Sequence, residues 1–112
     1  MQRFVMGYIT TPNQKEAKKL GGLILKERLA GCVNIVPEIK SMYWWNGKIE
    51  NQNEVVLIVK TRQLLAKKLI DFVKKHHEYN VPCINILPII DGNPDYFRWL
   101  DKETKHKKNK IR

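Results

Sequence analysis

The stretch CVNIVPEIKSMYWWNGKIENQNEVVLIVKT, residues Cys32–Thr61, predicts the element around which the rest of the chain is arranged. At its centre is Asn46-Gly47, a dipeptide typical of a two-residue type I′ turn, because both central positions of that turn need positive φ. β-Branched and aromatic residues crowd both arms, as a half-buried pleated surface prefers. The stretch therefore predicts two long antiparallel strands joined at Asn46-Gly47.

A two-residue turn also predicts which residues of the two strands face each other. Counting outward from Trp45 opposite Lys48 places Val36 opposite Leu57. Pro37 lies next in this register and has no amide proton to donate to the partner strand. We therefore expect a β-bulge or an edge position at Pro37.

The half of the hairpin furthest from the turn is apolar on both faces. Side chains alternate across a strand, so Val55, Leu57 and Val59 point one way and Val56 and Ile58 the other. An antiparallel sheet with one face in water alternates more cleanly than this. The chain is too short for two layers of helices, so we expect its own helices on one face and another subunit at the tip or edge. The alternative is a hairpin whose apolar residues all pack within one chain.

The flanking segments give the order strand, helix, strand, strand, helix, strand. Residues 3–10 are typical of a strand, and Asn13 begins a helix as its N-cap. Residues 63–76 carry the apolar stripe of a second helix, and residues 83–87 alternate as a last strand. A short aromatic helix follows Asn93-Pro94. The order predicts an α+β protein of the ferredoxin-like β-α-β-β-α-β type, a sandwich with a long central hairpin and a short C-terminal helix.

Length and composition bound the class of protein. A chain of 112 residues with 43% hydrophobic residues is typical of one globular domain. No apolar run approaches the roughly 20 residues that span a bilayer, and the first residues lack a secretory leader pattern. Cys32 and Cys83 do not make a disulfide framework, so we expect a reducing, cytoplasmic location. We expect the domain to cover residues 1–103 and residues 104–112 to form a basic, flexible tail.

The charge of the chain is strongly basic but unevenly spread. Of the formal net charge of +10, the last twelve residues, DKETKHKKNKIR, supply +4 from six Lys or Arg and two acids. Basic surfaces attract nucleic acids and anionic membranes. This tail has no interleaved aromatic residues and no RNA-binding signature, so a solvated tail is favoured over nucleic-acid binding. Neither a nucleic acid nor a membrane is an expected partner.

Two histidines and two cysteines are the candidate metal ligands. His76 and His77 end the second predicted helix, and Cys83 follows six residues later. Neutral imidazole suits Cu(II) and Zn(II), and thiolate suits Cu(I) or Zn. From the residues alone, His76 is better explained as a packed or C-capping histidine, and Cys32 and Cys83 as small buried hydrophobic residues. For His77, which opens an irregular loop, a functional role and a structural one are equally favoured.

The sequence does not favour an enzyme. It has no Gly-rich phosphate loop, no nucleophile elbow and no HExxH motif. Nothing marks either cysteine as an activated nucleophile. Five aromatic residues could line a pocket, but a subunit interface and the core explain them better. They are Tyr43, Trp44, Trp45, Trp99 and Tyr79.

Six segments that cover most of the chain carry a recognisable pattern. They are TTPN (10–13), ERLAGCVNIVP (27–37), SMYWWNGKIE (41–50), EVVLIVKT (54–61), HHEYNVPCI (76–84) and GNPDYFRWL (92–100). In their order and spacing, these segments together resemble the CutA family of divalent-cation tolerance proteins.

The resemblance implies a homotrimer of ferredoxin-like subunits, with an architecture similar to that of PII-type signalling proteins. It implies tolerance of, or response to, divalent ions through binding of copper or another divalent transition metal that is not required for folding. The ligands that the resemblance implies are His76, His77 and Cys32. Cys83 is a further candidate because it lies six residues from His77 in the sequence. The alternative is a trimeric signalling or scaffold protein that binds a small molecule or partner at the subunit clefts.

Three positions depart from the pattern of that family. Ile9 stands where some members have a cysteine, and Glu78 replaces the proline that follows the histidines. Cys83 replaces an acidic residue that often follows Val-Pro. All three departures concern the metal site that the resemblance implies.

Overall fold

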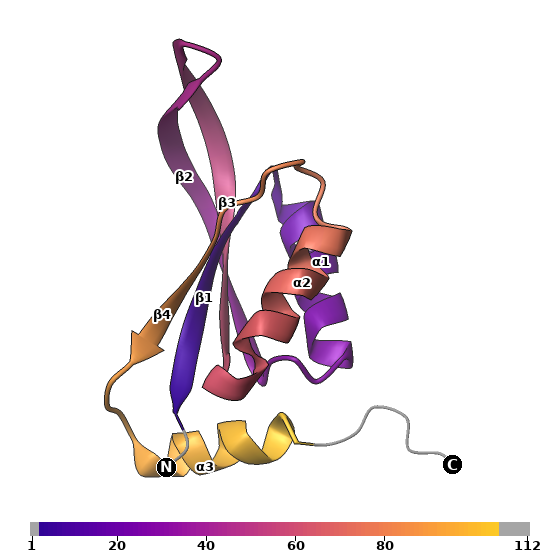
Figure 1. Cartoon of the computed structure of the whole chain (residues 1–112), viewed down its shortest axis with the longest axis vertical. Coiled ribbons are helices and arrows are strands. Elements are labelled where there is room, and N and C mark those ends of the chain that lie inside the picture. Colours follow the sequence, from indigo (N-terminus) through magenta and orange to yellow (C-terminus); the bar gives the residue numbers. More distant parts are fainter. Residues whose placement is uncertain (1–2, 106–112) are drawn as a thin grey trace.

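One antiparallel sheet with helices against it forms the structure, a computed structural model that describes residues 3–105 (Figure 1). The sheet has the strand order β2-β3-β1-β4, which leaves β2 and β4 at its edges. This arrangement confirms the predicted α+β, ferredoxin-like fold. In chain order the elements are β1 (Phe4–Thr11), α1 (Gln14–Lys26), β2 (Cys32–Trp45), β3 (Lys48–Arg62), the 3-10 turn η1 (Gln63–Leu65), α2 (Ala66–His76), β4 (Ile84–Ile89) and α3 (Pro94–Glu103).

Two asparagine caps start helices where the sequence predicts them. The Asn13 side-chain oxygen accepts the Glu16 amide proton at 2.8 Å, which satisfies one of the unpaired amides at the start of α1. The Asn93 side-chain oxygen accepts the Asp95 amide proton at 3.0 Å, with Pro94 in the first turn of α3.

The hairpin keeps the predicted register only between its turn and the bulge. Trp45 faces Lys48, and Asn46 and Gly47 both have positive φ (50° and 78°), as a type I′ turn requires. The expected bulge lies between Val36 and Ile39 and contains Pro37. It shifts the register by one residue, so the predicted pairing of Val36 with Leu57 is wrong.

Beyond the bulge, Val36 faces Val56 and Ile35 faces Leu57. Because facing residues share a face of the sheet, this shift places Ile35 beside Leu57 on the side that α1 and α2 cover. The bulge therefore directs the apolar residues of β2 into the core.

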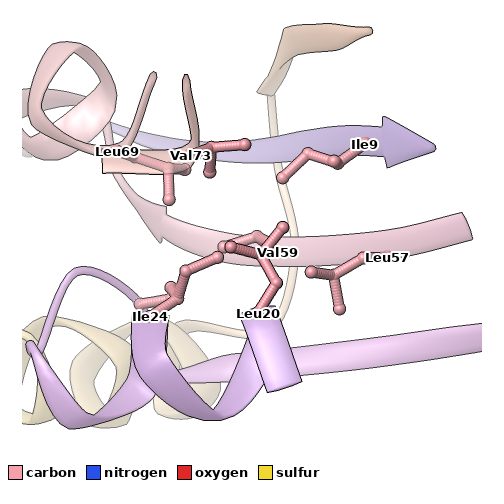
Figure 2. Packing of buried hydrophobic residues seen from close by; sticks show 8 residues of the cluster. Ile9, Leu20, Ile24, Leu57, Val59, Leu69 and Val73 are labelled. Carbon is pink, nitrogen blue, oxygen red and sulfur yellow. The ribbon is translucent and has the colours of Figure 1, made fainter. Parts of the chain in front are cut away.

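The hydrophobic core fills the space between the sheet and the helices α1 and α2 (Figure 2). Each strand or helix around it contributes alternate or helically spaced apolar side chains, as the sequence pattern predicts. Gly21 lets α1 approach the sheet closely, since a Cβ atom there would lie 3.2 Å from Val33 Cγ2 and 3.3 Å from Leu57 Cδ1. The labelled core residues are Ile9, Leu20, Ile24, Leu57, Val59, Leu69 and Val73.

The helix α3 covers one end of the other face of the sheet, at the end furthest from the hairpin tip (Figure 1). Its Phe97 ring stacks on Phe4 with 4.7 Å between the ring centroids. Arg62 of β3 donates a hydrogen bond to the Thr104 hydroxyl at 2.8 Å, and Thr104 is buried. The residues of the predicted tail after Lys105 lie outside the described residues.

The outer half of the β2–β3 hairpin extends beyond the rest of the molecule (Figure 1). Its aromatic side chains are largely exposed in the single chain, with 71% of the surface of Trp44 and 51% of that of Trp45 accessible. Across residues 3–105, no helix is both long enough and apolar enough to cross a membrane.

Candidate functional site

The C-terminal end of α2 carries the two candidate histidines, and the backbone changes direction between them. His76 is the last helical residue, whereas His77 has an extended backbone (φ −83°, ψ 149°). The helix α2 therefore ends at His76. The two imidazole rings consequently contact different parts of the fold.

His76 is exposed and packs along its own helix. Its Nδ1 atom lies 2.9 Å from the Phe72 carbonyl oxygen, and its ring centroid lies 4.2 Å from that of Phe72. Since a carbonyl oxygen only accepts, Nδ1 carries the proton and donates it. In the neutral ring the Nε2 lone pair is then left for another partner. This is the arrangement in which a histidine commonly binds a metal, with its second nitrogen held by a backbone carbonyl.

His77 is half-buried and uses both ring nitrogens. Nε2 lies 2.8 Å from the Thr10 carbonyl oxygen, and the Tyr79 amide donates to Nδ1 at 3.0 Å. These contacts join the end of α2 to β1 and to the loop of residues 77–83. The structure thus separates the roles of the two adjacent histidines.

Tyr79, which follows His77 in the loop, contacts the buried carboxylate of Glu54. Tyr79 donates its hydroxyl proton to Glu54 Oε2 at 2.8 Å and accepts a hydrogen bond from Gln52 Nε2 at 3.2 Å. Gln52 Oε1 in turn accepts from the Tyr43 hydroxyl at 2.5 Å. Glu54 is only 7% exposed. Burial and then the neighbouring Glu54 carboxylate raise the pKa of Tyr79 above its usual value of 10.0, so the hydroxyl stays a donor.

These four side chains lie along a groove on the face of the sheet that α1 and α2 do not cover. The groove has a volume of about 710 Å³, and the loop residues Asn80 and Val81 form part of its wall. Trp45 and Glu50 also line it. Sequence reasoning did not find Glu54 or Gln52, although their spacing of two residues indicates a shared face.

Cys32 lies apart from the histidines and from Cys83. Cys32 begins β2 and pairs with Lys60, which pairs with Met6 of β1. Thr10, whose carbonyl oxygen contacts His77, lies four residues beyond Met6 along β1. At the usual rise of a strand, Met6 and Thr10 are about 13 Å apart. Cys83 precedes β4 and lines the groove, where its sulfur accepts from Asn85 Nδ2 at 3.6 Å.

The structure does not bring the four predicted ligands around one ion. Within residues 3–105, no three His, Cys, Asp or Glu side chains form a group that could hold a metal ion. The assignment of His76, His77, Cys32 and Cys83 as ligands stays a prediction. The predicted interface residues Tyr43, Trp44, Trp45 and Trp99 are all exposed, by 39%, 71%, 51% and 43%.

Comparison with curated proteins finds close relatives over most of the chain. The protein CutA 1, chloroplastic, of Oryza sativa is 48% identical over 101 residues, which are 90% of this chain and 57% of the rice protein. The divalent-cation tolerance protein CutA of Archaeoglobus fulgidus is 43% identical over 102 residues, which are 91% of this chain and 97% of that protein. The chain spans little more than half the length of the rice and Arabidopsis thaliana relatives.

Solved structures of similar proteins have the same fold. The crystal structure of CutA1 from Oryza sativa superimposes with a TM-score of 0.90 at 46% identity, covering 94% of this chain and 96% of that one. The periplasmic divalent cation tolerance protein CutA from Archaeoglobus fulgidus gives a TM-score of 0.87 at 41% identity, covering 94% of this chain and all of that one.

A family model also matches nearly the whole chain. Residues 5–103 match the family model described as CutA1 divalent ion tolerance protein. The name of the Archaeoglobus fulgidus relative and the description of the family model point to a tolerance protein rather than an enzyme. With both the sequence match and the shared fold in place, this chain belongs to the CutA1 divalent ion tolerance protein family.

Proposed function

We propose that this protein acts in tolerance of, or response to, divalent metal ions by binding copper or another divalent transition metal as a cytoplasmic homotrimer. The family match over residues 5–103 carries the proposal. The chain's own chemistry supports it at His76, because an exposed neutral imidazole nitrogen is a good ligand for Cu(II) and Zn(II).

The surroundings of His76 also favour a cation. Glu16 of α1 and Glu78 of the loop line the same shallow depression as His76. Their carboxylates lower the local potential in a protein whose formal net charge is +10. A single imidazole holds a metal weakly, so we propose that water or a neighbouring subunit completes the coordination.

Exposed apolar surface supports the trimer. The aromatic residues of the hairpin tip and the groove beside them are open to solvent in a single chain, and patches of this kind commonly mark interfaces. Light scattering of the untagged protein tests this, with a trimer expected and a stable monomer at micromolar concentration as the contrary result.

Isothermal titration calorimetry with Cu(II) tests the metal site. We expect the His76→Ala variant to bind Cu(II) at least about tenfold more weakly than wild type, since loss of even an indirect partner of a metal ligand costs that much. Mg(II), which prefers oxygen ligands, serves as the control ion. Equal Cu(II) affinity of wild type and His76→Ala would remove His76 from the proposal, and absence of binding by wild type would remove the metal.

A second function, PII-like signalling or scaffolding, is favoured by the groove of about 710 Å³. Its volume and its mixture of aromatic walls with a few polar groups are typical of small-molecule sites. A thermal-shift screen with a crystal structure of any hit would test it, and ligand density beside residues 79–83 is the expected result. Hits that lie only elsewhere would count against this function.

A further inference from the structure

Backbone groups occupy both ring nitrogens of His77. The Thr10 carbonyl oxygen lies 2.8 Å from Nε2 and can only accept, whereas the Tyr79 amide lies 3.0 Å from Nδ1 and can only donate. The two contacts together require a neutral ring with its proton on Nε2. No lone pair of this ring is left for a metal ion.

Metal binding at His77 would therefore break contacts that the fold uses. An ion at Nδ1 displaces the Tyr79 amide, and an ion at Nε2 removes the proton that Thr10 accepts. Either change leaves a half-buried backbone group without its partner, which costs more than the hydrogen bond itself was worth. His76 carries no such cost, because its Nδ1 proton is already placed on Phe72 and its Nε2 is open.

The contacts of His77 and Tyr79 fasten one loop to two neighbouring strands. His77 holds its start to β1 through Thr10, and Tyr79 holds its middle to β3 through Glu54 and Gln52. The two rings also pack together, with 4.8 Å between their centroids. Residues 79–81 then continue as a wall of the groove.

We infer that His77 is a positioning residue that fixes the loop of residues 77–83 against the sheet, and that the metal chemistry of the adjacent histidines falls to His76 alone. The part concerning His76 rests on the proposed metal binding. The part concerning His77 rests on its hydrogen bonds and stands without any metal.

The test uses the whole 112-residue chain, labelled with 15N, and long-range 1H–15N correlation spectra of the histidine rings. We expect His77 to be the Nε2–H tautomer both without metal and with saturating Zn(II), a diamagnetic substitute for Cu(II). The Nε2 resonance of His76 should move on addition of Zn(II). In the His77→Gln variant, the Tyr79 amide should exchange with solvent at least about fivefold faster, the factor that one net hydrogen bond supplies.

The neighbouring variant His76→Gln is the matched control. It should leave the Tyr79 amide unchanged and weaken Cu(II) binding, whereas His77→Gln should leave Cu(II) affinity within about threefold of wild type. A metal-induced shift of the His77 nitrogens, or an unchanged Tyr79 amide in His77→Gln, would overturn the inference for His77. If wild type binds neither ion, the proposed function fails, and the tautomer and the amide exchange still decide the role of His77.

Discussion

Replacing Tyr79 with phenylalanine removes one oxygen atom and leaves the ring that packs on His77 in place. The change deletes the hydrogen bond to the Glu54 carboxylate, which is 2.8 Å long, and the weaker contact with Gln52 at 3.2 Å. Glu54 is 7% exposed and would then be a buried charge without this donor. The variant therefore isolates the hydroxyl from the packing of the ring.

The expected loss of stability follows from the charge on Glu54. A hydrogen bond to a charged group contributes about 1.5–3 kcal/mol, roughly twice the value for a neutral pair. The groove beside Glu54 is open, so water can approach the carboxylate and partly replace the hydroxyl. We therefore expect Tyr79→Phe to lower the free energy of unfolding by about 1.5 kcal/mol, at the low end of the range.

Urea denaturation at pH 7 measures this difference, with the protomer concentration held constant because assembly shifts apparent stability. A double-mutant cycle with Glu54→Gln separates the pairwise interaction from other effects. Tyr43→Phe is the matched control, since Tyr43 reaches Glu54 only through Gln52. If Tyr79→Phe stayed within about 0.5 kcal/mol of wild type, the range of ordinary surface substitutions, the hydroxyl would not hold the loop to the sheet.

Three further predictions concern pH, a helix cap and the docking of α3. Burial and the neighbouring Cys32 raise the pKa of Tyr96 from 10.0 to about 12, so between these pH values the folded protein keeps a proton that the unfolded chain releases. The free energy of unfolding should therefore fall as pH rises from 10 to 12, and it should fall less in the Tyr96→Phe variant. Urea denaturation at a series of alkaline pH values measures this difference. Asn13→Ala should cost about 1 kcal/mol in the same assay, because it removes the cap of α1, and no change would discount that cap. Gly31→Ala should cost about 1–3 kcal/mol, since the new Cβ would lie 2.6 Å from Leu100 Cδ1, and a neutral result would mean that α3 moves freely.

The sequence predicts the fold well because its signals are local. Asn46-Gly47 determines the turn and the register near it, and Asn13 and Asn93 determine where two helices begin. Pro37 indicates where the ladder is interrupted. It could not decide between a bulge, which shifts the register beyond that point, and an edge position without a shift, because the choice depends on packing Ile35 against the helices.

The candidate site is less accessible to sequence reasoning because its contacts are distant along the chain. His77 is recognisable as a candidate, yet its role depends on a carbonyl oxygen 67 positions away. Glu54 in an alternating strand is typical of a solvent-facing residue, and the tyrosine that covers it comes from a loop 25 positions further on. The ligand assignment, the trimer and the cytoplasmic location remain predictions that solution experiments must address.

The bulge beside Pro37 also makes the hairpin tolerant of a change in chain length at one place. Val36 pairs with Val56 and Ile39 pairs with Glu54, so two residues of β2 stand opposite the single residue Val55. Deleting Pro37 would therefore preserve both flanking registers and remove the residue that has no amide proton for the ladder, while straightening a strand that bulges normally bend and twist. A one-codon deletion would thus alter the direction in which the ribbon projects while the residue pairs on either side of the bulge stay the same.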